Sequence, residues 1–383
     1  MGTDEIARGR VQEAQLTTNC HDSFMLILTS GSTGLPKCVE HSTYAYANNM
    51  ALVNSVTKQD KRKMLLAPTD LNQVPYVVIF PVLTGSQTIV LVSNATRTHA
   101  EIVTAVLEER CESMNYMPVK MLHDLVNDPT VQECDLSFVT DVTVGGNTVS
   151  TTLLRQCARV FPNANIIEDY GISETWCLTV TGRREMTQEQ IERTEGPLLP
   201  HMEMKIVDKA GQVVPLNQKG EVWVRGYSVF KRYRGDEEKT AEVKTPDGWY
   251  KTGDIGVLDD DGLLAITGRI KDMIMKGSVS VHPAFVEQVL LEHPKASAVK
   301  VVSVPDPCFV EEICACIILK SGQTSDAEEM REYSEKNGLV GPMSPGYFVF
   351  MDSFPTTATD VKVDRKKIRV LAMDRLGLKE NAG

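Results

Sequence analysis

The sequence predicts an α/β protein, in which a parallel sheet (or sheets) with flanking helices and a small β-barrel-like unit precede a smaller α+β C-terminal domain. Strand-like apolar runs alternate with helical patterns up to about residue 203, a rhythm typical of βαβ units. Short β runs separated by turns follow over 204–268, and a mixed pattern occupies 269–383. We therefore expect a large domain over 1–268, with an α/β part (1–203) and a β-rich part (204–268), and a small domain over 269–383.

The elements of the first part follow from hydrophobic periodicity. Strands are expected where short apolar runs are rich in β-branched residues, and helices where apolar residues recur every three to four positions. An apolar run at Phe24–Ile27 precedes a glycine-rich loop. The remaining expected strands are Thr88–Val92, Val142–Val144 and Asn165–Ile167, and the expected helices are Ala100–Glu109, Val119–Val126 and Thr152–Val160.

The later elements are read in the same way. The acidic turn at 259–262, Asp-Asp-Asp-Gly, predicts a hairpin between two β runs. The β runs of the middle part are Met204–Val207, Glu221–Arg225, Gly253–Leu258 and Leu263–Ile266. The last part should contain helices near Pro283–Glu292 and Asp326–Lys336, strands at Ala298–Val304 and Glu312–Leu319, and a final strand followed by a basic tail.

Composition excludes several classes of protein. Hydrophobic residues make up 42% of the chain and charged residues 24%, values typical of a globular protein. A net charge of −11 argues against nucleic acid or an anionic membrane as the main partner. No apolar run reaches the roughly 20 residues that a membrane-spanning helix needs. The nine cysteines favour reduced thiols. Cys314 and Cys316 lie in an apolar run, so we expect buried strand positions there and no structural zinc.

The stretch TSGSTGLPK is the first candidate site. Two glycines allow a turn whose backbone N–H groups face an anion, and hydroxyls and a lysine add further donors and a charge. The residues with these properties are Thr29, Ser30, Gly31, Ser32, Thr33, Gly34 and Lys37. The loop differs from a Walker motif because no Gly-Lys-Ser/Thr follows the glycines. From the loop alone, a polyphosphate site and a plain surface turn both remain open.

Four further blocks occur in order after this loop, and together the five resemble the adenylate-forming superfamily. They are DYGISET (169–175), GWYKTGDIG (248–256), GRIKDMIMKG (268–277) and the weaker TATDVKVDR (357–365). The segments GEVWV and VRGYSVFKRYRGDEEKTAE are similar to those of acyl-CoA synthetases. The run EEICACIILK (311–320) particularly resembles animal medium-chain fatty acyl-CoA ligases.

The resemblance implies a reaction in two steps. A fatty, medium-chain carboxylate attacks the α-phosphate of ATP to give acyl-AMP and pyrophosphate, and the thiol of CoA then displaces AMP. Both steps need charge neutralisation and alignment. The resemblance also implies that the glycine-rich loop wraps the β- and γ-phosphates and reopens to release pyrophosphate.

The resemblance implies that the second block, DYGISET (169–175), binds the nucleotide and its metal ion. Tyr170 matches the ring that stacks on adenine, and Ser173 can donate to the α-phosphate. Glu174 matches the ligand of Mg²⁺, an ion that takes few carboxylates together with phosphate oxygens. The remaining nucleotide-site positions implied here are Gly145 and Gly146 beside the acyl pocket, Glu168 beside the adenine, and Asp169 and Gly171 of the second block. Gly171 permits a tight turn at the end of the strand.

The third and fourth blocks supply the ribose contacts and a hinge. Asp254 matches the carboxylate that accepts hydrogen bonds from the ribose hydroxyls, and Arg269 matches a second ribose contact. Lys271 falls where the family has a hinge, at which the C-terminal lid domain turns between the two half-reactions. A solvated Lys-Asp linker is the alternative at this position.

Lys362 matches the lid lysine whose ammonium neutralises charge between the carboxylate and the α-phosphate. A surface lysine of a basic tail is the alternative. The family pattern is Thr-Gly-Lys, and Asp360 and Val361 here interrupt it. An insertion of one residue reverses the face on which a strand residue lies.

Two alternatives to the CoA ligase remain open: an adenylating enzyme with a carrier-protein or other acceptor, and a catalytically impaired nucleotide-binding remnant. Family members carry a long segment before the glycine-rich loop, so we expect part of the N-terminal domain to be missing. The resemblance implies a mitochondrial protein, and a cytoplasmic one is the alternative because the N-terminal residues show no import pattern.

Overall fold

A computed structural model of the chain describes residues 13, 16–29, 37–57, 63–66, 88–92, 98–145, 149, 151–181, 186–277, 279–356 and 363–379. The chain divides into two compact units. The first comprises 1–205, 223–252 and 259–264, and the second comprises 206–222, 253–258 and 265–383. Among the described residues, no helix is both long and apolar enough to cross a membrane.

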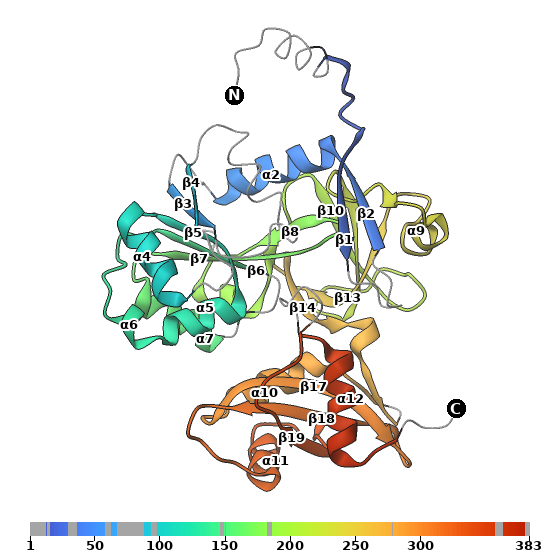
Figure 1. Cartoon of the computed structure of the whole chain (residues 1–383). Helices are drawn as coiled ribbons and strands as arrows, with labels where there is room; N and C mark the ends of the chain where they lie inside the picture. Colours follow the sequence, from blue (N-terminus) through green and yellow to red (C-terminus); the bar gives the residue numbers. More distant parts are fainter. Residues whose placement is uncertain are drawn as a thin grey trace. The chain divides into compact units, whose positions relative to one another are not determined.

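The first unit contains a mainly parallel sheet with the strand order β4-β3-β5-β6-β7-β8 (Figure 1). Neighbouring strands from β4 to β7 are parallel, and β8 is antiparallel to β7. The strands are β3 (Lys63–Leu66), β4 (Thr88–Leu91), β5 (Ser113–Pro118), β6 (Asp141–Gly145), β7 (Asn165–Ile172) and β8 (Trp176–Val180). The helices associated with them are α2 (Thr43–Thr57), α4 (His99–Glu109), α5 (Val119–Asn127), α6 (Pro129–Gln132) and α7 (Thr151–Val160).

Both faces of this sheet are covered by apolar side chains. Successive residues of a strand point to opposite faces, and β7 shows this directly. Ile166 packs against the core formed with α4, α5 and α7, whereas Ile167 packs with Val53 of α2 and with Val180 of β8. Gly145 and Ile172 are the last residues of β6 and β7, and the carboxyl ends of parallel strands are the usual position of a ligand site in such a sheet.

A second, antiparallel sheet of the first unit carries the glycine-rich loop. Its strand order is β1-β2-β12, with β1 (Ser23–Thr29), β2 (Lys37–Ser42) and β12 (Arg232–Tyr233). In this register Thr29 pairs with Lys37, and Tyr233 pairs with Val39. Two short helices of the first unit, α8 (Gln188–Arg193) and α9 (Glu237–Val243), begin at side-chain caps from Thr187 and Asp236.

The β-rich part of the sequence forms a sheet with the strand order β10-β11-β13-β14-β9. Its strands are β9 (Gly196–Pro197), β10 (Met202–Val207), β11 (Gly220–Gly226), β13 (Tyr250–Leu258) and β14 (Leu263–Arg269). Within the described residues this order ends at β10 and β9, so the sheet is open, and the expected barrel-like unit is not a closed barrel. The hairpin predicted at 259–262 is confirmed, because Gly262 N donates to Asp259 O and Gly262 has a positive φ of 74°.

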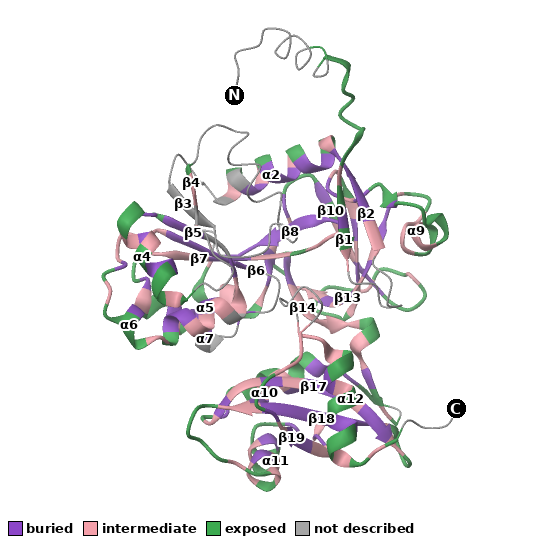
Figure 2. Ribbon diagram, viewed as in Figure 1, coloured by how far each residue is buried: buried purple, intermediate pink, exposed green. Residues whose placement is uncertain are grey.

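The C-terminal sheet of the second unit has the order β16-β15-β18-β17, and β19 pairs in parallel with β18. Its elements are η1 (Ile270–Asp272), β15 (Ile274–Lys276), β16 (Val279–Val281), α10 (Pro283–Leu291), β17 (Ala296–Asp306), β18 (Val310–Leu319), α11 (Ala327–Lys336), η2 (Gly341–Met343), β19 (Tyr347–Phe350) and α12 (Arg365–Leu376). Figure 2 shows β17 and β18 as largely buried strands.

The apolar run of β18 is continuous because both faces of the strand are covered. Ile313 and Ile317 contribute to the core shared with α10 and α11, while Cys314 and Cys316 contribute to the core shared with α12. The prediction that these cysteines occupy buried strand positions is confirmed. The basic tail, for which no element was predicted, forms α12; Asp364 caps its first turn by accepting from Lys367 N.

The structure makes Gly171 a sensitive position of the β7–β8 hairpin. A Cβ atom at residue 171 would lie 1.9 Å from the carbonyl oxygen of Trp176. Gly171→Ala should therefore lower the free energy of unfolding by about 3 kcal/mol, the upper range for steric overpacking. Denaturant titration of the purified protein measures this loss.

Gly262→Ala is the matched control, because Gly262 also lies in a hairpin turn but has no atom within 4 Å of an added Cβ. Gly262→Ala should lower the free energy of unfolding by about 1 kcal/mol, because the added side chain must adopt a left-handed backbone conformation but meets no other atom. Equal losses in the two variants would show that the close approach at Gly171 is not what the hairpin requires.

Candidate functional site

The stem of the glycine-rich loop is a pair of antiparallel strands. Thr29 is the last residue of β1 and Lys37 is the first residue of β2, and the two are paired. Five of the predicted loop residues, Ser30, Gly31, Ser32, Thr33 and Gly34, lie outside the described residues. The structure thus places the two ends of the predicted phosphate loop, and these ends belong to one hairpin.

Tyr233 lies beside this stem. It is 2% exposed and is held on β12, whose backbone pairs with β2 at Val39. The Nζ atom of Lys37 lies 4.5 Å from the centroid of the Tyr233 ring. This distance is typical of a cation–π interaction, in which the face of the ring attracts a cation.

Glu174 occupies the turn between β7 and β8, and its side chain contacts Tyr233 of β12. The Tyr233 hydroxyl donates to Glu174 Oε1 at 2.7 Å, and Phe230 N donates to the Glu174 carbonyl oxygen at 2.8 Å. Burial, and then the charge of Glu174, raise the pKa of Tyr233, so the hydroxyl keeps its proton as a donor. The structure therefore brings Lys37 and Glu174, both predicted site residues, to one tyrosine.

Sequence reasoning missed Tyr233. The residue lies in the segment VRGYSVFKRYRGDEEKTAE, which resembles acyl-CoA synthetases but carries no catalytic pattern of its own. The signal available was an aromatic residue between Arg232 and Arg234, which by itself does not indicate a contact with a carboxylate 59 positions away.

His41 fixes the other half of the β7–β8 turn. Its Nε2 atom lies 2.7 Å from the carbonyl oxygen of Ser173, and its ring packs against Trp176 at 4.3 Å between centroids. Burial lowers the pKa of His41 to about 4, so the imidazole is neutral near pH 7 and its Nε2–H donates to Ser173. Trp176 adopts a φ of 57°, a left-handed conformation that is costly for a bulky residue.

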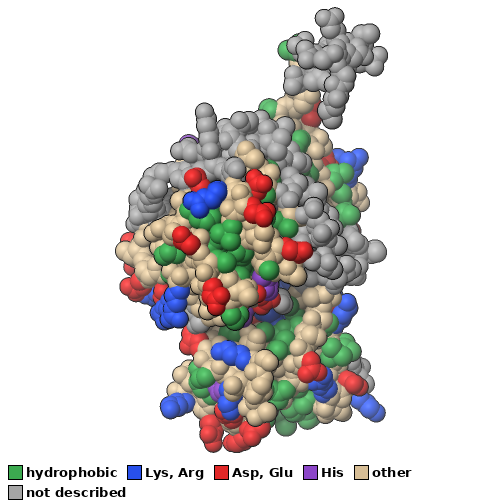
Figure 3. All heavy atoms as spheres, turned by 60° about the vertical axis from the view of Figure 1, so that its left-hand side comes forward, with side chains coloured by type: hydrophobic (Ala, Val, Ile, Leu, Met, Phe, Trp, Pro, Cys, Tyr) green, Lys and Arg blue, Asp and Glu red, His purple; other side chains and the backbone are tan. Residues whose placement is uncertain are grey.

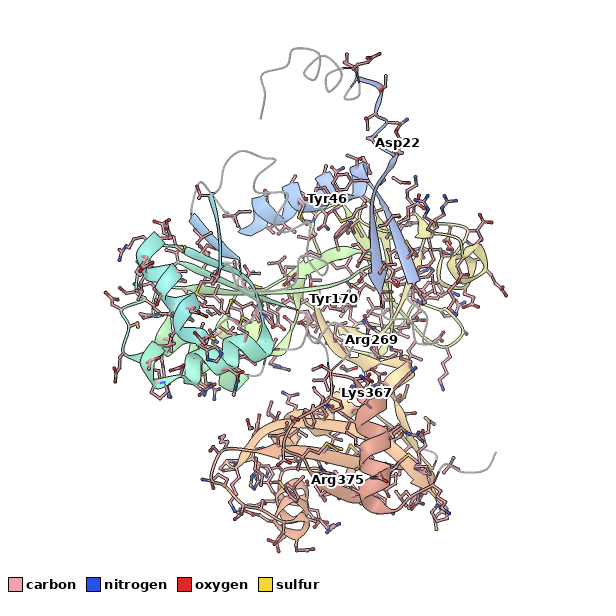
Figure 4. All side chains as sticks on the ribbon, viewed as in Figure 1. Asp22, Tyr46, Tyr170, Arg269, Lys367 and Arg375 are labelled. Atoms are coloured by element: carbon pink, nitrogen blue, oxygen red, sulfur yellow. The ribbon has the colours of Figure 1, made fainter. Side chains whose placement is uncertain are left out.

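The predicted adenine and acyl residues lie along neighbouring strands. Gly145 pairs with Asp169 and Val144 pairs with Glu168 in the parallel register of β6 and β7. Tyr170 is half-buried near the carboxyl end of β7 (Figure 4). Gly171 follows it, and Gly146 lies outside the described residues. The β6–β7 pair thus places Gly145 beside Asp169 of the second block.

Two neighbouring carboxyl groups of β7, Glu168 and Asp169, have enclosed oxygen atoms and form no ion pair with a cation among the described residues. Glu168 is 5% exposed and accepts a hydrogen bond from Val149 N at 3.1 Å. Burial, and then repulsion by Glu195, raise the pKa of Glu168 well above its usual range. Burial raises the pKa of Asp169 to about 7, and among the described residues its enclosed Oδ1 has no hydrogen-bond partner. Glu195 was not predicted, because no local pattern marks it as a neighbour of Glu168.

The second unit brings together the two predicted ribose residues. Asp254 is 2% exposed, and Arg269 Nε lies 2.7 Å from its Oδ1. The guanidinium therefore neutralises the buried carboxylate. Arg269 is the last residue of β14 (Figure 4), and it precedes the 3-10 turn η1, which contains the exposed predicted hinge residue Lys271.

Lys362 lies outside the described residues. The segment around it begins and ends at an isolated antiparallel bridge between Thr356 and Val363, just before the cap of α12 at Asp364. Among the described residues, no group of three or more His, Cys, Asp or Glu side chains is arranged to hold a metal ion. On the face shown in Figure 3, acidic and basic side chains are interspersed.

Comparison with protein families gives two matches. The family described as "AMP-binding enzyme" matches residues 3–234, and the family described as "AMP-binding enzyme C-terminal domain" matches residues 286–360. The first match spans more than half of the chain.

Individual relatives agree with the family match. The medium-chain acyl-CoA ligase ACSF2, mitochondrial, of Danio rerio is 34% identical over 96% of this chain and 61% of its own length. The protein of the same name from Macaca fascicularis is 32% identical over 94% of this chain and 59% of its own length. The chain therefore spans about three fifths of the curated relatives it matches.

One solved structure is similar in both fold and sequence. The amide bond synthetase McbA from Marinactinospora thermotolerans matches with a TM-score of 0.82 at 29% sequence identity. The match covers 90% of this chain and 68% of that chain.

The buried carboxyl pair predicts a pH dependence of stability. Because the pKa of Glu168 is higher in the folded chain than in the unfolded one, its contribution is fully present at low pH and is lost as pH rises through the folded value. Glu168→Gln removes this loss and keeps an oxygen to accept from Val149 N. The variant should gain roughly 1 to 2 kcal/mol over the wild type at pH 8 and much less at pH 4.5.

Denaturant titrations at the two pH values test this, with Glu189→Gln as the control. Glu189 is an exposed glutamate paired with Arg193 on α8, so its replacement should not change the pH dependence. A Glu168→Gln variant that parallels the wild type at both pH values would contradict the prediction.

Proposed function

Because this chain belongs to the family of AMP-binding enzymes, we propose that it activates a carboxylic acid with ATP and transfers the acyl group to the thiol of CoA. The observation that carries the proposal is the contact of Tyr233 with both Lys37 and Glu174, which joins the stem of the phosphate loop to the expected metal ligand. The names of the curated relatives support a medium-chain fatty acid as the substrate.

In the proposed first step, a carboxylate oxygen of the acid attacks the α-phosphorus of ATP. The new P–O bond gives acyl-AMP, and the bond to the β-phosphate oxygen breaks to release pyrophosphate. In this proposal Lys37 and the loop hydroxyls neutralise the β- and γ-phosphates, and the Ser173 hydroxyl donates to the α-phosphate. Lys362 neutralises the charge between the acid and the α-phosphate.

In the proposed second step, the sulfur of CoA attacks the acyl carbon after loss of its proton. A C–S bond forms, and the bond from the acyl carbon to the AMP oxygen breaks, so that acyl-CoA and AMP leave. The hinge proposed at Lys271 provides the change of backbone angles by which the C-terminal domain serves both steps. In this proposal the large domain ends at residue 268 and the mobile C-terminal domain begins at residue 269.

Glu174 fits the role of a magnesium ligand. Its Oε1 is engaged by Tyr233, and among the described residues its Oε2 has no hydrogen-bond partner. A single carboxylate suits Mg²⁺, which completes its shell with phosphate oxygens and water. When bound, the ion supplies positive charge to the phosphates.

The remaining nucleotide contacts follow from the second block and the ribose pair. We propose that the ring of Tyr170, which lies between Asp169 and Gly171 in the sequence, stacks on adenine. We also propose that Asp254 accepts hydrogen bonds from the ribose hydroxyls and that Arg269 is the second ribose contact. Glu168, and Gly145 with Gly146, border the adenine and the acyl group. The curated relatives are named as mitochondrial, which supports that compartment over the cytoplasm.

The main alternative is a second step in which the acyl group is transferred to an acceptor other than CoA. The structural neighbour McbA is named an amide bond synthetase, and an amide bond forms when an acyl group is transferred to an amine. An amine or a carrier-protein thiol would replace CoA in the second step and leave the first step unchanged. A catalytically impaired nucleotide-binding remnant is the third possibility.

Acid-dependent exchange of pyrophosphate into ATP tests the first step. With octanoate the wild type should exchange label, and Glu174→Ala and Lys362→Ala should each lower the rate at least about 100-fold, as expected for groups that stabilise a developing charge. Lys366→Ala, an exposed lysine of the same basic segment, is the control and should retain the rate.

Identical rates in all four proteins would reject the assignments of Glu174 and Lys362. Tight binding of ATP without any exchange of pyrophosphate would show that the chain is a catalytically impaired nucleotide-binding remnant. Where exchange occurs, competition among CoA, a carrier-protein thiol and an amine for the acyl group decides the acceptor.

The ribose assignment is tested with 2′-deoxy-ATP. Asp254→Asn should weaken binding of ATP about 10-fold or more, the typical effect of losing a charge-assisted hydrogen bond. The preference of the wild type for ATP over 2′-deoxy-ATP should also shrink, because the lost acceptor served that hydroxyl. Calorimetry measures both affinities. Unchanged discrimination in Asp254→Asn would contradict the assignment.

A further inference from the structure

We propose that Tyr233 is a positioning residue that aligns the metal-binding carboxylate of Glu174 with the lysine of the phosphate loop. This inference rests on the proposed function, because it assigns a purpose to a contact between two of its residues. Tyr233 touches both partners with different parts of one side chain: the hydroxyl contacts Glu174, and the face of the ring contacts Lys37.

The hydroxyl restricts the carboxylate. A glutamate side chain has rotatable bonds whose freedom is lost when it binds a metal. The 2.7 Å hydrogen bond to Oε1 and the bond from Phe230 N to the backbone oxygen hold Glu174 at two points. The carboxylate is thus oriented before the metal arrives, and Oε2 is left to coordinate it.

The ring restricts the lysine more loosely. The Nζ atom of Lys37 lies over the ring at 4.5 Å from its centroid, and the Lys37 side chain makes no hydrogen bond or ion pair with the described residues. A cation–π contact keeps the ammonium near the carboxylate without a directional bond. The ammonium can therefore turn toward a phosphate without breaking a hydrogen bond.

Tyr233 is itself held firmly, as a positioning residue must be. Its N–H donates to Thr240 Oγ1 at 3.0 Å, and its ring packs on Phe230 at 4.8 Å between centroids. The hydroxyl of Tyr250 donates to the Tyr233 oxygen, and Tyr250 also packs on Phe230. Tyr250 thus extends the series of hydrogen bonds that runs through Tyr233 to Glu174.

Two substitutions separate the two functions of Tyr233. Tyr233→Phe removes the hydroxyl and keeps the ring, so it should weaken binding of Mn²⁺ to the protein–ATP complex about 10-fold. It should leave binding of ATP in EDTA unchanged. Tyr233→Leu removes the aromatic ring as well. It should also weaken ATP binding in EDTA about threefold, because Lys37 loses the cation–π contact that holds its ammonium. Electron paramagnetic resonance of free Mn²⁺ and calorimetry provide these values without turnover.

Tyr227→Phe is the matched control. Tyr227 belongs to the same unit, and its hydroxyl is buried without a hydrogen-bond partner among the described residues. Its loss should change neither the Mn²⁺ affinity nor the ATP affinity. Tyr250→Phe, which removes the bond behind Tyr233, should weaken Mn²⁺ binding by a smaller factor, about threefold, and tests the same chain if Tyr233→Phe folds poorly.

A third variant separates failure of this inference from failure of the proposed function. Glu174→Gln should abolish the Mn²⁺ effect of Tyr233→Phe, so that the double variant resembles Glu174→Gln alone. If Glu174→Gln weakens Mn²⁺ binding but Tyr233→Phe and Tyr250→Phe do not, the positioning role is overturned and the metal ligand stands. If Glu174→Gln binds Mn²⁺ like the wild type, the assignment of the metal ligand is wrong and the positioning role falls with it.

Discussion

The site depends on a sharp turn between β7 and β8. The turn is possible because Gly171 has no side chain at the point where the carbonyl of Trp176 approaches. Trp176 in turn adopts a left-handed backbone conformation, which stores strain that the surrounding contacts must offset. His41 and Phe230 supply such contacts by bonding the carbonyls of Ser173 and Glu174. A donor hydroxyl and a carboxylate are thereby fixed next to each other at the carboxyl end of the sheet.

The buried carboxyl groups of the site differ in how their charge is compensated. Asp254 forms an ion pair with a guanidinium, and a carboxylate in such a pair accepts hydrogen bonds from neutral hydroxyls. Glu168 and Asp169 have no cation beside them among the residues that the structure describes, and burial raises the pKa of each. A carboxyl in that condition readily holds a proton and can donate as well as accept. The strand beside the predicted adenine site therefore offers both kinds of hydrogen-bonding group, which suits the edge of a purine base.

The sequence predicted what depends on local periodicity and missed what depends on distant contacts. The helices α4 and α5 and the strands β17 and β18 were predicted within a few residues, because their apolar patterns match the faces that they bury. The five motifs predicted site roles for Glu174, Asp254 and Arg269, which stay predictions, and the structure pairs Asp254 with Arg269. Tyr233 and Glu195 carried no local signal, since each acts on a residue brought near only by the fold. The helix α12 was missed because its weakly amphipathic basic sequence resembles a solvated tail.

The contrast between Glu174 and Lys37 explains how one cluster can be both rigid and responsive. Glu174 is tied by directional hydrogen bonds at its side chain and its backbone, and such bonds to a charged group are among the stronger ones in proteins. Among the described residues, the ammonium of Lys37 contacts the face of the Tyr233 ring and no hydrogen-bond acceptor, and a cation–π interaction at a partly exposed position contributes about 1 kcal/mol. A phosphate oxygen offers the ammonium a stronger, charge-assisted partner at little cost. The carboxylate consequently stays in place while the lysine changes partners, and Tyr233 is the side chain that permits both.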